Sequence, residues 1–137
     1  MKPGVVLVAT LGRSYQTAIT AILDKDPEFV WFICSKQSKI NIPAIEQEFE
    51  GLGIVMPTIL GTTETAHDDL MRIYQDALRI FKTLEDTKRV IYLDLTGGTV
   101  PMSLGAWEAS RHVPDIIVSW IDFAPIPTIH VLSMPKI

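Results

Sequence analysis

The chain has 137 residues, of which 47% are hydrophobic, with a net charge of −4 and a single cysteine. This length and apolar content predict one compact domain with a substantial core, and the acidic balance argues against a protein that holds long nucleic acid on a broad basic surface. One cysteine excludes a disulfide framework, and the spacing of Cys and His residues predicts no metal site. The apolar run near the N-terminus is too short for a signal sequence or a membrane span, so we expect a cytoplasmic domain without membrane contact.

Along the chain, apolar runs alternate with amphipathic stretches of helical length. About six strands are expected, at Val5–Ala9, Phe29–Cys34, Val55–Leu60, Val90–Leu95, Ile116–Phe123 and Thr128–Leu132. Three or four helices are expected between them, at Ser14–Leu23, Pro43–Leu52, Asp68–Leu84 and Pro101–His112. This order predicts an α/β fold with a mostly parallel open sheet and helices on both faces.

The C-terminal part of the chain has a different pattern. Asp122–Pro127 is a proline-bounded turn between two β-rich runs. Two strands so close in sequence favour an antiparallel hairpin at the edge of the sheet. We expect residues 1–137 to form a single domain, with no second domain after the hairpin.

Three loops at the expected carboxyl ends of the strands are rich in hydroxyl groups, small residues or cations. They are Thr10–Ser14, Ser35–Lys39 and Thr96–Thr99, and a fourth candidate is Gly61–Glu64. Ligands bind at this edge of open α/β sheets, so we expect the loops to form one pocket for a phosphorylated or nucleotide-like ligand.

The stretch from Arg89 to Met102 is the most informative of these segments. An apolar strand runs into Thr96-Gly97-Gly98-Thr99 and then into a helix that opens with a proline. Glycines at a helix N-terminus let backbone N–H groups approach an anion closely. Alternatively, the motif is only a tight turn with threonine capping, and Thr10 or Ser14 only caps the first helix.

The same residues carry a resemblance to a known family. Asp94-Leu-Thr-Gly-Gly-Thr-Val-Pro-Met102, paired with the N-terminal Ala9-Thr-Leu-Gly-Arg-Ser14, resembles the CRISPR-associated Rossmann fold (CARF) sensor domains over nearly the whole chain. The resemblance implies a Rossmann-like fold and a homodimer that binds cyclic oligoadenylate, most simply cyclic tetra-adenylate, across its two-fold interface. It also implies no cofactor and a fused or associated effector, with this chain as the sensor part of a longer protein.

The ligand-binding residues that the resemblance and the loops together indicate are Thr10, Leu11, Gly12, Arg13, Ser14, Ser35, Lys36, Gln37, Thr96, Gly97, Gly98, Thr99 and Met102. Many members of the family carry a lysine directly after Thr-Gly-Gly-Thr, whereas this chain has Val100. We therefore expect Lys36 or Arg13 to supply the positive charge.

Two alternative functions follow from the same residues. One is a stand-alone, metal-independent ring nuclease, in which a ribose 2′-hydroxyl attacks the adjacent phosphate and the candidate catalytic groups are Ser14, Lys36 and Thr99. The other is a small monomeric α/β enzyme or binding protein for a mononucleotide or sugar phosphate, which would use the same glycine loop.

Overall fold

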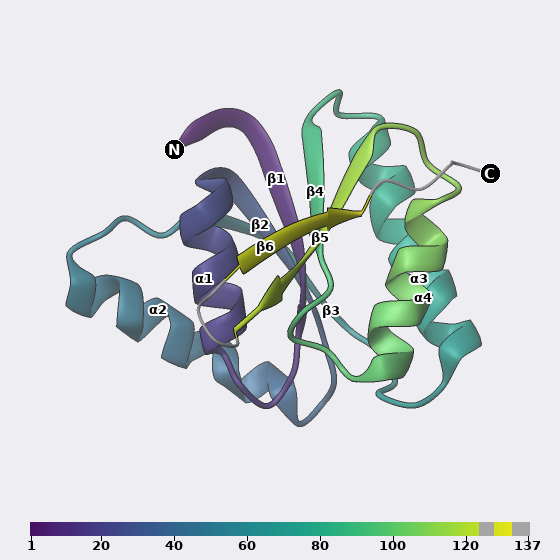
Figure 1. The fold of residues 1–137 in the computed structure, drawn as a ribbon, viewed down its shortest axis with the longest axis horizontal. Coiled ribbons are helices and arrows are strands. Elements are labelled where there is room, and N and C mark those ends of the chain that lie inside the picture. The colour runs from purple at the N-terminus through teal and green to yellow at the C-terminus, as the bar shows by residue number, and fades with distance from the viewer. Residues whose placement is uncertain (124–127, 133–137) are drawn as a thin grey trace.

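The fold is a six-stranded sheet covered by helices on both faces (Figure 1). The structure is a computed structural model that describes residues 1–123 and 128–132. Its elements are β1 (Lys2–Leu11), α1 (Gln16–Lys25), β2 (Pro27–Cys34), the 3₁₀ turn η1 (Ser38–Ile40), α2 (Asn41–Leu52), β3 (Thr58–Glu64), α3 (Leu70–Glu85), β4 (Val90–Asp94), α4 (Val100–Ser110), β5 (Ile116–Asp122) and β6 (Thr128–Leu132).

The sheet has the strand order β3-β2-β1-β4-β5-β6. All neighbouring pairs are parallel except β5 and β6, which pair antiparallel at the edge. The expected mostly parallel sheet with an antiparallel edge hairpin is therefore confirmed. Residues 124–127 of the expected proline-bounded turn lie outside the described residues. Strands β2 and β3 lie on one side of β1, and strands β4, β5 and β6 lie on the other. The boundary between β1 and β4 is therefore the topological switch point of the sheet, which is where open α/β sheets bind ligands.

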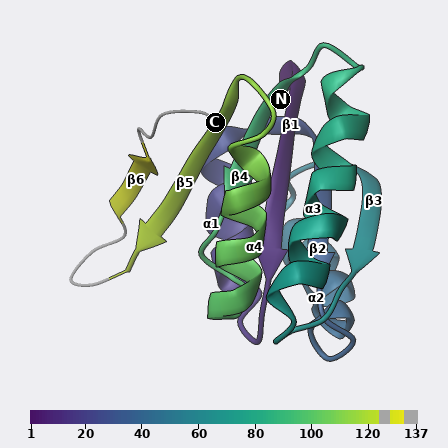
Figure 2. The ribbon, with the colours of Figure 1, turned by 90° about the vertical axis from the view of Figure 1, so that its right-hand side faces the viewer.

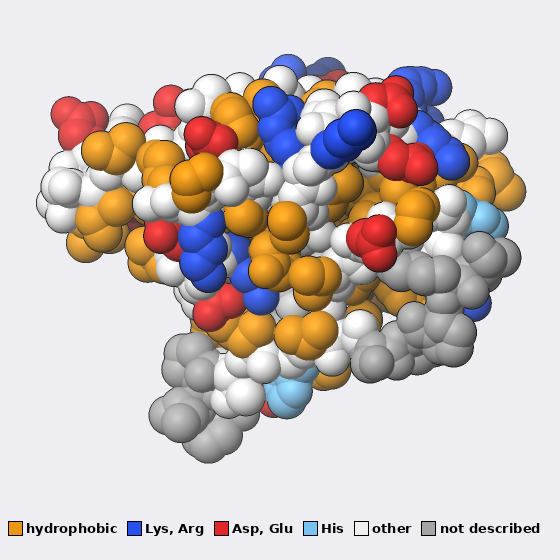
Figure 3. All heavy atoms as spheres, turned by 90° about the horizontal axis from the view of Figure 1, so that it is seen from above, with side chains coloured by type: hydrophobic (Ala, Val, Ile, Leu, Met, Phe, Trp, Pro, Cys, Tyr) orange, Lys and Arg blue, Asp and Glu red, His pale blue; other side chains and the backbone are white. Residues whose placement is uncertain are grey.

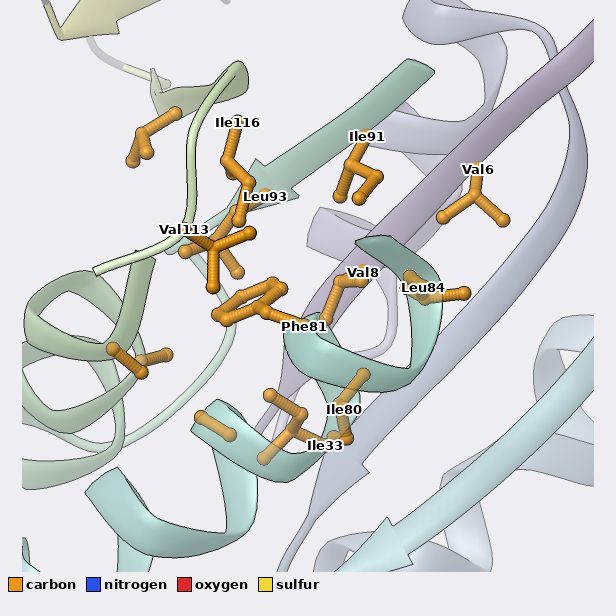
Figure 4. Close-up of a cluster of buried hydrophobic side chains, with 14 of the residues drawn as sticks. Val6, Val8, Ile33, Ile80, Phe81, Leu84, Ile91, Leu93, Val113 and Ile116 are labelled. Atoms are coloured by element: carbon orange, nitrogen blue, oxygen red, sulfur yellow. The ribbon is translucent and has the colours of Figure 1, made fainter. Parts of the chain in front are cut away.

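Two apolar layers hold the helices to the sheet. Helices α3 and α4 cover one face and α1 and α2 cover the other (Figure 2). In the first layer, Phe81 of α3 lies against Val8 of β1 and Val113 (Figure 4). The central strand β1 is buried on both faces, because consecutive residues from Val6 to Ala9 alternate between the two layers. This explains why its sequence is continuously apolar rather than alternating.

The third strand is placed differently from the sequence prediction. Residues from Thr58 to Glu64 pair with β2, whereas Val55 is 78% exposed and precedes the strand. Pro57 lacks an N–H group for a sheet ladder, which places the strand after it. The prediction that Gly61–Glu64 is a ligand loop is therefore wrong.

A tryptophan explains the glycine within this strand. A Cβ atom at Gly61 would lie 2.6 Å from the ring of Trp31 on the neighbouring strand. The indole N–H of Trp31 also donates to Thr63 Oγ1 at 2.9 Å. Gly61 thus makes room for a side chain of the neighbouring strand.

The start of α1 also differs from its prediction. The helix begins at Gln16, its N-cap residue is Tyr15, and no side chain in the described part of the chain caps it. The alternative that Thr10 or Ser14 caps this helix is therefore wrong. Thr10 lies within β1, and the Ser14 carbonyl accepts a hydrogen bond from Thr17 Oγ1.

Candidate functional site

The candidate site lies at the carboxyl ends of the strands, at the lower edge of Figures 1 and 2. A pocket of about 420 Å³ opens there. It lies beside the β1–β4 switch point, and the loops that follow β1, β2, β3 and β4 contribute to it. Its lining residues are Leu11, Gly12, Arg13, Ser35, Gln37, Ser38, Ile40, Asn41, His67, Thr99 and Met102.

The loops after β1 and β4 are joined by a buried threonine. Thr10 is 1% exposed, and its hydroxyl group donates to the Asp94 carbonyl oxygen at 3.3 Å and accepts from the Gly98 N–H at 3.1 Å. Thr10 therefore acts beneath the pocket, where it fixes the glycine turn to the end of β1. Since the Gly98 N–H is used in this bond, it is not a free donor for a ligand.

Glycine is required where these two loops cross. A Cβ atom at Gly12 would overlap the carbonyl oxygen of Gly97, and one at Gly97 would overlap the carbonyl oxygen of Thr10. A Cβ atom at Gly98 would lie 2.9 Å from that of Thr10 and 3.0 Å from that of Met102. Gly12 and Gly97 thus allow close packing of backbone against backbone, and Gly98 allows close packing against the side chains of Thr10 and Met102. This packing brings the two loops to one pocket.

Thr99 caps helix α4, as one reading of the motif predicts. Its hydroxyl group accepts from the Met102 N–H at 3.3 Å and donates to the His67 carbonyl oxygen at 2.6 Å. The second bond ties the start of α4 to the loop between β3 and α3. The side chain of Thr99 also lines the pocket, so capping and contact with a ligand are compatible.

The loop after β2 is closed by a pair of serines. The Ser35 N–H donates to Ser38 Oγ at 2.8 Å, and the Ser38 N–H donates to Ser35 Oγ at 3.1 Å. Both residues line the pocket. Next along the chain, Asn41 donates from Nδ2 to the carbonyl oxygens of Gly12 and Arg13, at 2.8 and 3.1 Å. Asn41 therefore holds the β1–α1 loop against the start of α2.

The predicted site residues fall into two groups. Those that line the pocket are Leu11, Gly12, Arg13, Ser35, Gln37, Thr99 and Met102. Those placed beneath or beside it are Thr10, Ser14, Lys36, Thr96, Gly97 and Gly98. Of the two candidate cations, Arg13 lines the pocket and Lys36 is exposed on the adjacent loop.

Sequence reasoning missed three lining residues, Ile40, Asn41 and His67, and placed a fourth, Ser38, in the predicted loop Ser35–Lys39 without naming it as a ligand-binding residue. The signal for His67 was the position of β3, because a strand that ends at Glu64 places the next residues in a loop at the carboxyl edge. For Asn41, the signal was an amide residue at the start of an amphipathic helix.

Two further features concern charge at and around this edge. Within residues 1–123 and 128–132, no three His, Cys, Asp or Glu side chains lie close enough together to hold a metal ion. Burial raises the pKa of the Cys34 thiol, at the end of β2, to about 11.

On the opposite edge, at the amino ends of the strands, Lys and Arg side chains lie among acidic and hydrophobic ones (Figure 3). Among the described residues, no helix is long and apolar enough to cross a bilayer.

Comparison with known proteins shows the fold. No protein-family model and no curated protein match the chain. Among solved structures, Can2 from Sulfobacillus thermosulfidooxidans in complex with cyclic tetra-adenylate is 19% identical with a TM-score of 0.67, over 86% of this chain and 32% of that one. Enterococcus italicus Csm6 bound to cyclic hexa-2′-fluoro-hexa-dAMP is 12% identical with a TM-score of 0.71, over 94% of this chain and 41% of that one.

A third solved structure is a type III CRISPR defence DNA nuclease activated by cyclic oligoadenylate. It is 16% identical with a TM-score of 0.68, over 89% of this chain and 19% of that one. The chain thus spans less than half the length of each of these structures. At these identities the likeness is one of fold. The expected resemblance is confirmed at that level: the chain shares the Rossmann-like fold of these three structures.

Proposed function

We propose that this domain binds cyclic oligoadenylate in the pocket at the β1–β4 switch point and acts in the cytoplasm as the sensor of a type III CRISPR response. One observation carries the proposal. The Thr10–Ser14 and Thr96–Thr99 segments, predicted from sequence to share a ligand, cross at one pocket, and similar folds hold cyclic oligoadenylates. Arg13 supplies positive charge at the pocket wall. It takes the role of the lysine that many CARF domains carry at the position of Val100.

A homodimer completes the proposed site. An apolar hollow of about 630 Å³ lies between α3 and α4, and it is lined by Leu70, Met71, Tyr74, Leu104, Gly105, Trp107 and Glu108. It begins close along the chain to the ligand pocket, because His67 lines the pocket and Leu70, three residues later at the start of α3, lines the hollow. Exposed apolar patches of this kind mark interaction surfaces. Packing of a second copy on this face would place two pockets side by side for one two-fold symmetric ring.

The direct test is a calorimetric titration with cyclic tri-, tetra- and hexa-adenylate. We expect tight binding of the tetra-adenylate at one ring per two chains, with sedimentation as a dimer. Binding at one ligand per monomer, or binding of mononucleotides alone, would favour the mononucleotide or sugar-phosphate reading. Regulation of an effector is then tested by joining the domain to its natural partner and measuring activity with and without the ring.

The role of Arg13 is tested by Arg13→Gln. Loss of a charge-assisted contact to phosphate costs about 1.5–3 kcal/mol, so the affinity is expected to fall about tenfold or more, with a weaker dependence on salt. The matched control is Arg79→Gln, because Arg79 is exposed on α3 and outside the pocket. Equal affinities of the two variants would exclude Arg13 as the ligand's cation.

One observation favours a second activity, cleavage of the bound ring. His67 lines the pocket, and histidine is the side chain best suited to proton transfer at neutral pH. In this reaction the 2′-hydroxyl oxygen attacks the adjacent phosphorus and the bond to the 5′-oxygen breaks, which leaves a 2′,3′-cyclic phosphate and a 5′-hydroxyl. Neutral His67 would take the 2′-hydroxyl proton, and the leaving oxygen would receive a proton from the imidazolium or from water.

We expect His67→Gln to slow any such cleavage by about 10²–10³-fold while the affinity for the ring changes little. The control is His112→Gln, because His112 follows α4 and does not line the pocket. Products are separated by chromatography after prolonged incubation. Intact ligand with the unmodified protein would leave the domain a sensor alone, and equal turnover in both variants would remove His67 from the reaction.

A further inference from the structure

A buried acidic residue lies beneath the turn that forms the pocket. Asp94 ends β4 and is 2% exposed. Its Oδ1 atom accepts the Thr96 N–H at 3.0 Å, and its backbone carbonyl accepts the hydroxyl group of Thr10. Through Thr10, which also accepts the Gly98 N–H, Asp94 is connected to both ends of the glycine turn.

Within residues 1–123 and 128–132, the other oxygen of this carboxyl group has no hydrogen-bond partner. Asp94 Oδ2 is buried without a hydrogen bond in the described part of the chain. The residue paired with Asp94 on β5 is Ser119, which is 0% exposed, and its hydroxyl oxygen is also buried without a partner there. Paired residues of neighbouring strands point to the same face, so the two unbonded groups lie on the same side of the sheet.

Burial is the main influence on the charge of Asp94. It raises the pKa of the carboxyl group to about 6, although hydrogen bonds from Thr96 oppose the shift. From α1, Lys25 lowers this pKa and Asp24 raises it. The neighbours in register, Ala9 on β1 and Ser119 on β5, carry no charge. In the pocket itself, His67 and Arg13 are the ionisable groups.

We infer that Asp94 is a positioning residue of the candidate site, which holds the glycine turn through its carboxyl group and takes up a proton from solvent when a polyanionic ligand binds. The inference rests on the proposed function. Phosphates in the pocket add negative charge near the end of β4 and therefore favour the neutral form of a buried carboxyl group. The neutral form keeps an acceptor for the Thr96 N–H and gains an O–H donor on the side where Ser119 has an unbonded acceptor.

The experiment is calorimetric titration with cyclic tetra-adenylate between pH 5.5 and pH 8, in pairs of buffers that differ in ionisation enthalpy. Affinity is expected to fall about tenfold over this range, because each pKa unit by which the ligand raises the pKa of Asp94 corresponds to a factor of about ten. Near pH 7 the heat should depend on the buffer, as proton uptake requires.

Variants assign the proton to its residue. Asp94→Asn keeps an acceptor for the Thr96 N–H and stays neutral, so it should bind at pH 8 as tightly as the unmodified protein binds at pH 5.5, without buffer-dependent heat. His67→Gln should retain most of the proton uptake. The inference is overturned if Asp94→Asn keeps the full pH dependence, or if His67→Gln abolishes it.

A second readout needs no ligand. In ¹H–¹⁵N NMR spectra, the Thr96 and Gly98 amide signals should titrate together with a midpoint near pH 6, and Asp94→Asn should abolish this change. If no ring binds at any pH, the proposed function fails while this titration still decides the positioning role. Amide signals that do not titrate would overturn it.

Discussion

Replacing Gly12 with alanine is expected to destabilise the domain by about 3 kcal/mol and to lower its melting temperature by about 10 °C. The added Cβ atom would overlap the backbone carbonyl oxygen of Gly97, and its own position is fixed by the backbone of a loop that follows a paired strand. Neither can rotate away as a side chain would. Ligand affinity should fall as well, because the two loops would be forced apart at the pocket.

The matched control is Gly51→Ala, measured by the same thermal and urea unfolding. Gly51 lies in α2, and a Cβ atom there would meet nothing within 4 Å. Since alanine favours helix more than glycine does, this variant should be more stable by about 0.5–1 kcal/mol. If Gly12→Ala melts at the same temperature as the unmodified protein, the β1–α1 loop and the glycine turn can move apart without loss of stability, and the prediction is wrong.

Asp94→Asn is expected to stabilise the folded domain by up to about 3 kcal/mol at pH 7.5. The pKa of Asp94 is raised in the folded state from 3.8 to about 6. The folded protein therefore holds this proton more tightly than the unfolded chain, so the carboxyl group lowers stability progressively as the pH rises from 3.8 to 6. Above that window the full penalty is present, and asparagine removes it.

The measurement is urea unfolding of both proteins at pH 4.5, 6 and 7.5. The difference between them should be small at the lowest pH and largest at the highest. Asp68→Asn serves as the control, because that side chain is 74% exposed and its replacement should change stability by less than about 0.5 kcal/mol at every pH. A loss of stability in Asp94→Asn at pH 7.5 would mean that the charged bond to the Thr96 N–H outweighs the cost of burial.

Strand and helix order could be predicted from the sequence because the pattern is strong. Buried parallel strands such as β1 are continuously apolar, and α3 carries Ile73, Ala77 and Phe81 at helical spacing. The position of β3 could not, because this strand lies at the sheet edge and alternates weakly, while the apolar Ile54 and Val55 precede it in an exposed segment. Pro57 was the local signal that the strand begins after the exposed apolar segment, because proline has no N–H group for a sheet ladder.

The candidate site was predictable in its loops and less so in its individual contacts. Topology brings the ends of β1, β2 and β4 to one edge, and that follows from element order alone. Whether a residue lines the pocket or supports it depends on side-chain direction. Thr10 is turned toward Asp94 and Gly98, and Thr96 accepts the Ile121 N–H at 2.7 Å, so both brace the turn from outside the pocket. His67 could be found only once β3 ended at the right residue.

The bond between Thr10 and Gly98 joins positions 88 residues apart. The chain between them contains α1, β2, α2, β3 and α3, so β1 and β4 can pair only after a long loop has been closed at a cost in entropy. The pocket can therefore exist only after these two strands have paired, and no fragment that lacks either strand can contain it. A bound ligand should accordingly slow the unfolding of the entire domain, because its binding site is lost as soon as the two halves of the sheet separate.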